Sequence, residues 1–149
     1  MRIRNWYPLL AITVLFACAT TPAPAPRTSA EDLARNIVAE LGSAYERRDV
    51  RDFMALVSAR YLEGYGDFQA RIEDSLDAAS SIELEIVPER IWAGDEKDRV
   101  FVDARWKKTR ITGPHRSPEV TTGRVTFTFI RYGSDILKLF SQKGNPVFP

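Results

Sequence analysis

The residues of this chain best suited to acid–base chemistry are few and lie far apart in the sequence. General acid–base catalysis needs a carboxylate, an imidazole or a phenol within hydrogen-bonding reach of the reacting atom. The best carboxylate by pattern is Asp103, which lies in an alternating apolar–polar segment with Arg105 and Lys107. Because residues two apart share a strand face, these two cations favour a cross-strand ion network on a solvated surface over a catalytic carboxylate.

The histidine and the tyrosines supply the other groups that could transfer protons. His115 lies between two prolines in GPHRSPE (113–119), so we expect an exposed loop histidine and not a catalytic one. Tyr45, Tyr61 and Tyr65 could line the mouth of a pocket. Tyrosines on amphipathic helices and turns usually pack with the hydroxyl outward, which favours a structural role.

Tryptophans are expected in the core rather than as platforms for a ligand, and this applies to Trp92 and to Trp106. Trp106 nevertheless lies in the same expected strand as the best carboxylate. The candidate pocket residues are Tyr45, Tyr61, Trp106 and Asp103.

Composition excludes several kinds of site. The 149-residue chain has one cysteine and one histidine, which exclude an internal disulfide, a thiolate zinc cluster and a multi-histidine metal site. It has no glycine-rich phosphate loop, nucleophile elbow or metal-ligand spacing, so neither a cofactor nor a metal is predicted. With 21 basic and 20 acidic residues the chain is nearly neutral, and nucleic acid is not an expected partner.

The first 17 residues, MRIRNWYPLLAITVLFA, have the layout of an export signal. Arg2 and Arg4 form a positive start, and an apolar run follows from Trp6 to Ala17. That run is shorter than the roughly 20 residues that a membrane-spanning helix needs, which favours a cleaved signal peptide over a permanent span. A buried first helix of the domain is the alternative.

The end of the apolar run, Leu15-Phe16-Ala17-Cys18, resembles the bacterial lipobox, although Phe16 stands where a smaller residue is usual. The resemblance implies that Cys18 receives a diacylglyceryl group, becomes the mature N-terminus and is acylated on its amine. Several acyl chains anchor a protein stably to a lipid bilayer. Ala19, in place of aspartate, favours the outer membrane of the bacterial envelope, facing the periplasm. A buried or free cysteine is the alternative.

Residues 18–29 are expected to form a tether between the anchor and the folded domain. The segment is rich in proline and alanine, and its prolines disfavour helical dihedral angles. Without large apolar side chains it cannot bury enough surface to offset the entropy of ordering. We therefore expect an extended spacer, and a proline-rich recognition motif is the alternative.

Residues 30–149 have the patterns of one folded domain. Apolar residues with helical spacing predict a helix after Ser29, a short helix after Asp49 and a third helix capped by Asp67. Beyond Ser81 the pattern alternates with a period of two. The predicted strands are Ile82–Ile86, resuming toward Trp92, then a strand around Val100–Lys107, Arg124–Phe129 and Ile136–Phe140.

Three helices followed by sequential strands predict an α+β fold in which N-terminal helices pack on one face of a curved antiparallel sheet. This order resembles the nuclear transport factor 2-like (SnoaL-like) superfamily over about residues 30–148. The segment ERRDVRDFMALVS is similar to a helix–turn–helix of that superfamily, and RYGSDILKLFSQKGNPVFP is similar to its last strands. The resemblance implies a cone-like sheet closed by helices.

The resemblance leaves the function open, because the superfamily contains enzymes, binding modules and assembly factors. Our first hypothesis is an envelope lipoprotein that binds a small apolar ligand, a peptide or another envelope protein without catalysis. The second is an isomerase- or dehydratase-type enzyme with acid–base residues inside the cone. The third is a homodimeric structural module that associates through the open sheet face around Arg124, Thr126 and Thr128.

Overall fold

The fold was analysed in a computed structural model, which describes residues 29–96, 98–112, 117–133 and 135–149. The expected signal peptide, Cys18, nearly all of the expected tether and His115 lie outside these residues. Among the helices of the described part, none is long and apolar enough to cross a membrane.

The first two helices begin where the sequence places their caps. Helix α1 spans Ala30–Glu46, and the Ser29 side chain accepts a hydrogen bond from the Asp32 backbone N–H. Helix α2 spans Val50–Ala55, and Asp49 accepts in the same way from Asp52. In both cases a short polar side chain satisfies one of the unpaired N–H groups of the first turn.

The prediction that Asp67 caps the third helix is wrong. Helix α3 spans Tyr65–Asp77 and begins after Gly64, which has a φ of 94° and makes no side-chain capping bond. Glycine adopts a positive φ readily because it has no Cβ atom, so the helix begins about one turn earlier than the capping pattern suggests. Asp67 instead lies in the first turn of α3.

Four strands form one antiparallel sheet in the order β1-β2-β3-β4, so each strand pairs with the next along the chain. Their bounds are Ala79–Ala93 for β1, Arg99–Thr112 for β2, Pro118–Tyr132 for β3 and Ile136–Gly144 for β4. The strands are longer than predicted. Strands β2 and β3 pair in continuous register over nearly their whole length, and pairing with β1 and β4 continues past register shifts between Pro88 and Arg90 and between Thr128 and Phe129.

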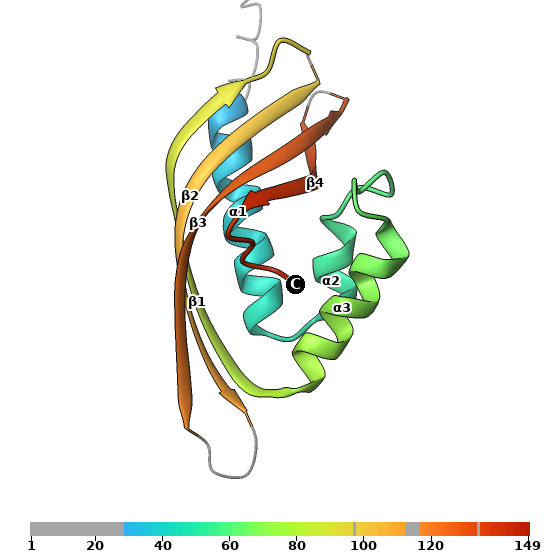
Figure 1. The fold of residues 1–149 in the computed structure, drawn as a ribbon. Helices are drawn as coiled ribbons and strands as arrows, with labels where there is room; N and C mark the ends of the chain where they lie inside the picture. Colours follow the sequence, from blue (N-terminus) through green and yellow to red (C-terminus); the bar gives the residue numbers. More distant parts are fainter. Residues whose placement is uncertain (1–28, 97, 113–116, 134) are drawn as a thin grey trace, which may run out of the picture.

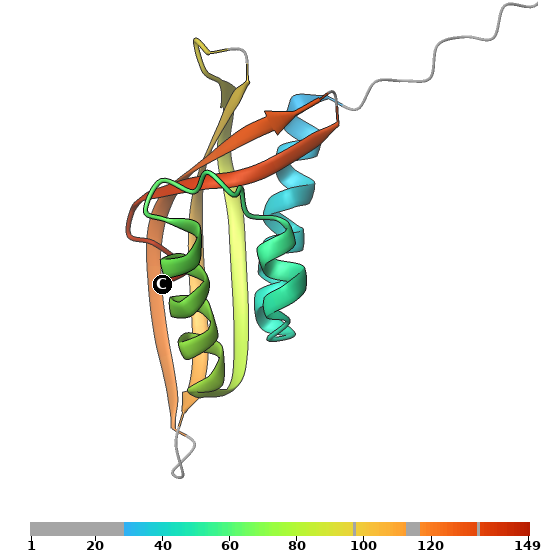
Figure 2. The same cartoon turned by 90° about the vertical axis from the view of Figure 1, so that its right-hand side faces the viewer.

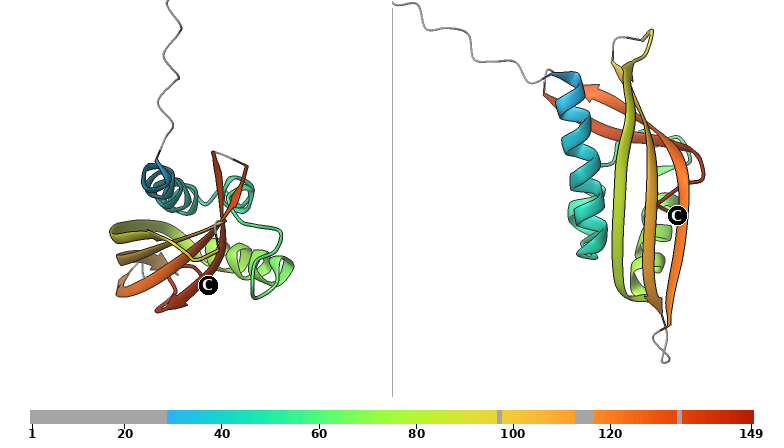
Figure 3. Two further views of the ribbon diagram at one scale, coloured as in Figure 1. Left: turned by 90° about the horizontal axis from the view of Figure 1, so that it is seen from above. Right: turned by 90° about the vertical axis from the view of Figure 1, so that its left-hand side faces the viewer.

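The three helices lie on one face of the curved sheet and leave the other face uncovered (Figure 1). Helix α1 packs mainly along β1, whereas Figure 2 shows α3 in front of the sheet, running in nearly the same direction as the strands. The views along and across the strands agree on this two-layer arrangement (Figure 3). The predicted α+β architecture, with helices on a curved antiparallel sheet, is therefore confirmed.

The hydrophobic core fills the space between the two layers. Its largest fully buried side chains include six aromatic rings, which come from both layers and from the C-terminal end: Tyr45, Phe53, Phe68, Phe127, Phe129 and Phe148. After β4 the chain turns inward, so its C-terminal end lies between the sheet and helices α2 and α3 (Figure 1). We call Asn145–Pro149 the C-terminal segment.

Candidate functional site

Alternate residues of strand β2 lie on opposite faces of the sheet, so the candidate functional side chains are divided between an inner and an outer face. Val100, Val102, Ala104 and Trp106 are buried beneath the helices, and continued alternation places Lys108 and Arg110 on this inner face. Asp103, Arg105 and Lys107 occupy the opposite, outer face. The proposed carboxylate and the proposed tyrosines are thus on different sides of the sheet.

The polar residues of the inner face bind the main chain of the C-terminal segment. The Trp106 indole Nε1–H donates to the Asn145 carbonyl oxygen at 2.9 Å. The Lys108 ammonium group donates to the Val147 carbonyl oxygen at 2.8 Å. Because Trp106 and Lys108 are two residues apart on one strand, they reach carbonyl oxygens two residues apart in the segment.

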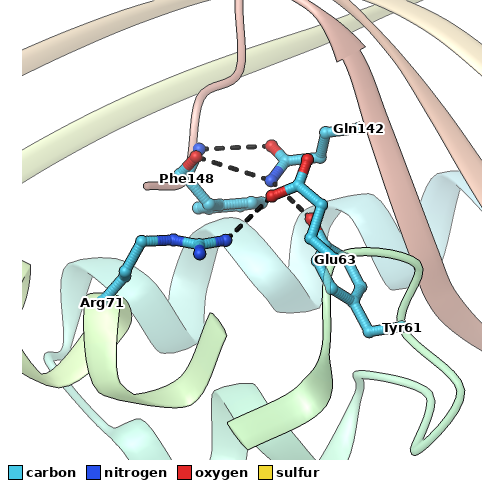
Figure 4. A network of polar contacts seen from close by, with 5 residues as sticks. All are labelled: Tyr61, Glu63, Arg71, Gln142 and Phe148. Atoms are coloured by element: carbon cyan, nitrogen blue, oxygen red, sulfur yellow. Dashed lines mark hydrogen bonds and ion pairs between the residues drawn. The ribbon is translucent and has the colours of Figure 1, made fainter. Parts of the chain in front are cut away.

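Gln142 of β4 holds the same segment from the other side (Figure 4). Its side-chain oxygen accepts from the Phe148 backbone N–H at 3.2 Å, and its side-chain nitrogen lies 3.5 Å from the Phe148 carbonyl oxygen. The same nitrogen is 3.3 Å from the Tyr61 hydroxyl. An ion pair between Arg71 and Glu63, at 2.8 Å, lies beside this network.

Phe148 fills the interior at the point where the layers meet. Its side chain is 1% exposed. The ring packs edge-on against Phe53 at a centroid distance of 4.8 Å, and lies 5.1 Å from Tyr45 and 6.2 Å from Phe127. Tilted and edge-on contacts of this kind are favourable arrangements of aromatic rings. The C-terminal segment is therefore an integral part of the core.

Lys108 lies on the inner face of the sheet, close to two aromatic rings. Its Nζ atom lies 5.8 Å from the centroid of Tyr45 and 5.6 Å from that of Trp106. Burial lowers the pKa of Lys108, the neighbouring charge of Arg110 lowers it further, and Glu119 acts in the opposite direction. The ring contacts and the Val147 carbonyl stabilise the ammonium form that burial disfavours.

The two candidate tyrosines are buried, with their hydroxyls bonded inside the protein instead of pointing outward. The Tyr45 hydroxyl is 2.8 Å from the Ser75 hydroxyl, and burial raises the pKa of Tyr45 despite this bond and the charge of Arg110. Tyr61 stacks on Phe68 at 4.1 Å, and burial is also the main cause that raises its pKa. Both phenols are therefore held in the protonated form.

The outer face carries the other sequence candidates. Asp103 accepts a hydrogen bond from the Thr126 hydroxyl of β3 at 2.6 Å, and Arg105 forms an ion pair with Glu89 of β1. Next to them a groove of about 560 Å³ opens between outward side chains of β1, β2 and β3. Trp92, which was expected in the core, lies only partly buried on this face and stacks on Phe101 at 5.4 Å.

The structure therefore brings Tyr45, Tyr61 and Trp106 to the interior and separates Asp103 from them. Tyr65 lies at the start of α3, where its hydroxyl is 3.4 Å from the Met54 carbonyl oxygen. In the described part of the chain, no group of three or more His, Cys, Asp or Glu side chains is placed to hold a metal ion.

Sequence reasoning missed the residues that bind the C-terminal segment, namely Lys108, Gln142 and Phe148. A signal for Lys108 was present, because the alternation that buries Trp106 also turns the residue two positions later inward. No comparable signal marks Phe148, because Gly144 and Pro146 separate it from the periodic pattern of the last predicted strand.

Comparisons with known proteins identify the fold. An NTF2-like superfamily protein from Salmonella enterica serovar Typhimurium superimposes with a TM-score of 0.65 and 11% identity, over 80% of this chain and 97% of that one. A provisionally assigned dehydratase of the NTF2-like family from Streptomyces avermitilis gives a TM-score of 0.63 and 15% identity, over 80% and 97%.

A third structure, Bd1075 from Bdellovibrio bacteriovorus, gives a TM-score of 0.62 and 15% identity. The match covers 78% of this chain but only 41% of Bd1075. No protein-family profile matches the sequence, and no curated protein matches it either. At these identities the likeness shows the fold alone, so the domain has an NTF2-like fold.

Proposed function

We propose that this protein is a lipid-anchored component of the bacterial envelope whose NTF2-like domain is a non-enzymatic binding module. The observation that carries the proposal is the occupied interior. Phe148 and its aromatic neighbours fill the space between sheet and helices, and Trp106, Lys108 and Gln142 are engaged by the C-terminal segment. Binding then takes place on the outer face of the sheet, where helices leave β1–β3 uncovered (Figure 3).

The arrangement of titratable groups also supports a binding role. An isomerase or dehydratase needs an acid and a base that both reach the reacting atoms of one bound substrate. Asp103 lies on the outer face in a hydrogen bond with Thr126, whereas the phenols of Tyr45 and Tyr61 lie inside the domain. A substrate in the interior would have to displace the C-terminal segment before it met either phenol.

An enzyme remains the second candidate, because Lys108 and Tyr45 place an amine and a phenol in the interior and one structural neighbour is a provisionally assigned dehydratase. The purified full chain is to be assayed against carbonyl and epoxide substrates, with Lys108→Met and the outward Lys107→Met as a matched pair. We expect no turnover by any of the three proteins. Turnover that is lost in Lys108→Met and kept in Lys107→Met would contradict the binding-module proposal.

The envelope location rests on the lipobox-like residues Leu15–Cys18. Growth of bacteria that express the full chain with an alkyne analogue of palmitate tests it directly. We expect the wild-type protein to be labelled and to sediment with membranes, and Cys18→Ser to remain unlabelled. A labelled Cys18→Ser variant would refute the anchor without bearing on the folded domain.

A homodimer is the third candidate, and the distribution of charge on the outer face favours it over other assemblies. On the outer face Glu83, Glu85 and Glu89 belong to β1, whereas Arg105, Lys107, Arg124 and Lys143 belong to β2, β3 and β4, where Asp103 of β2 lies among them. Two copies related by a twofold axis could pair these opposite charges. Sedimentation of the full chain in neutral detergent should then show a dimer that salt weakens, and a monomer at every concentration excludes it.

A further inference from the structure

The groove on the outer face has the size and the charge of a site for a small anionic ligand. Its volume of about 560 Å³ lies within the range of pockets that hold small molecules. The walls come from alternate residues of three strands, among them Val87 of β1, Arg105 and Lys107 of β2, and Thr122 and Arg124 of β3. Because the strands are paired over their whole length here, these side chains are held at fixed spacings.

The register places like charges together in this groove. Arg105 and Arg124 are directly opposite each other on β2 and β3, and Lys107 is opposite Thr122. Like charges at directly opposite positions destabilise a sheet. Glu85 is the one acidic residue that lines the groove, and it stands opposite Lys107.

The positive charge of the groove is only partly neutralised by the protein itself. Glu89 pairs with Arg105. Within the described residues, neither Arg124 nor Lys107 forms a hydrogen bond or an ion pair through its side chain. Both side chains are exposed, and Glu85 stands opposite Lys107 without forming an ion pair with it. The guanidinium group of Arg124 and the ammonium group of Lys107, at diagonally neighbouring positions of β3 and β2, are therefore available to a ligand.

The floor of the groove brings main chain and neutral polar groups close to these cations. Gly123 lies here, and an added Cβ at this position would come within 2.7 Å of the Trp106 ring and 2.9 Å of the Asn145 Cβ atom. Trp106 can pack flat against the strand only because Gly123 has no side chain. Thr122 also lines the groove, and its hydroxyl can donate to an oxyanion.

We propose that this groove binds the phosphate group of a small ligand, with Arg124 and Lys107 supplying the charge and Val87 contacting an apolar part of the ligand. Two unpaired cations balance the charge of a phosphate better than that of a carboxylate. The planar guanidinium group can also donate hydrogen bonds to two phosphate oxygens at the same time. This inference rests on the proposed use of the outer face for binding. It specifies that the ligand of the outer face carries a phosphate group.

Titration of the full chain with inorganic phosphate, in neutral detergent and at constant ionic strength, tests the site by NMR. We expect the Thr122, Gly123 and Arg124 amide resonances to shift and to saturate. Arg124→Gln should weaken this binding by about tenfold or more, because a charge-assisted hydrogen bond is lost. Arg51→Gln, which removes the same charge from the exposed face of α2, should leave the affinity unchanged within about twofold.

Two results would overturn the proposal: no saturable shift in the wild-type protein, or an equal loss in Arg124→Gln and Arg51→Gln. The binding-module proposal itself would survive either result, since it fails on interior turnover that depends on Lys108. Bicelles of phosphatidylglycerol distinguish the source of the phosphate. Competition with inorganic phosphate for the same amides identifies a lipid headgroup, and its absence alongside saturable phosphate binding identifies a soluble phosphorylated compound.

Discussion

At the scale of single residues, Lys108 joins the sheet, the helices and the C-terminal segment. Its ammonium group bonds the Val147 carbonyl oxygen and lies near the rings of Tyr45 and Trp106. Burial lowers its pKa below the ordinary value of 10.5, so the protonated form is less stable in the folded protein than in the unfolded chain. That difference makes the stability of the domain depend on pH.

The sign of this dependence follows from proton binding. Between the lowered pKa and 10.5 the unfolded chain binds more protons at Lys108 than the folded protein does, so the free energy of unfolding rises with pH. The raised pKa values of Tyr45 and Tyr61 act above pH 10.0, where their contribution to stability falls as pH rises. The Lys108 effect ends at pH 10.5 and the tyrosine effect begins at pH 10.0, so the two overlap only between these values.

We predict that Lys108→Met removes the rise in unfolding free energy that occurs between the lowered pKa of Lys108 and pH 10.5. Urea denaturation of the full chain at a series of pH values measures the slope, which is independent of the constant loss caused by the missing bond to Val147. Lys107→Met is the matched control, because Lys107 is exposed on the opposite face and should keep the wild-type slope. An unchanged slope in Lys108→Met would show that Lys108 is not the linked group.

At the scale of elements, the loop between α1 and α2 contains a strained residue. Arg48 has a φ of 59°, in the left-handed region, while the neighbouring amides of Arg48 and Asp49 bond the carbonyl oxygens of Tyr45 and Ala44. A side chain with a Cβ atom pays about 1 kcal/mol for this conformation. The bonds on both sides hold the residue there despite that cost.

We predict that Arg48→Gly raises the free energy of unfolding by about 0.5–1 kcal/mol, because glycine adopts this conformation without the steric cost. Thermal and urea denaturation provide the measurement. Arg47→Gly is the control and should lower stability, because Arg47 has ordinary helical dihedral angles and its side chain bonds Ser43. A loss of stability in both variants would mean that the Arg48 side chain stabilises the loop.

The elements also show how far the sequence alone can be interpreted. Periodicity located α1, α2 and every strand, because burial of one face imposes a repeat that single residues do not obscure. It failed at the start of α3, where the backbone freedom of Gly64 outweighed the capping signal of Asp67. The strands predicted from periodicity are also too short. The register shift after Pro88 and the start of β3 at Pro118 produce no alternating pattern in the sequence.

The site was less predictable than the fold for a related reason. Alternation correctly grouped Asp103, Arg105 and Lys107 on one face, but the groove depends on Arg124 lying opposite Arg105. That register is set by pairing between strands and cannot be derived from either strand alone. The packing of Phe148 depends on the return of the chain into the interior, which no local pattern encodes.

At the scale of the whole molecule, Phe148 connects all the layers. Its ring contacts Tyr45 of α1, Phe53 of α2 and Phe127 of β3. Its backbone is bonded to Gln142 of β4. A single side chain near the C-terminal end therefore supports both the helical layer and the sheet.

We predict that Phe148→Ala lowers the free energy of unfolding by about 3–5 kcal/mol, because a large ring is removed from a packed interior. Val120→Ala is the control, since Val120 is 56% exposed and its truncation should change stability by less than about 0.5 kcal/mol. Urea denaturation followed by fluorescence and by circular dichroism compares the two. A loss below about 1 kcal/mol in Phe148→Ala would show that the C-terminal segment is only loosely attached.

The position of Phe148 in the order of synthesis bears on when the domain can fold. Ribosomes release a chain from its N-terminus onward, so α1, α2 and the first strands are present before residues 147 and 148 emerge. Until then the aromatic cluster lacks the ring that Phe53 packs against edge-on and the carbonyl group that Lys108 binds. The nascent domain therefore stays short of its final stability until residues 147 and 148 are present, and the packing of the helices on the sheet is completed late in synthesis.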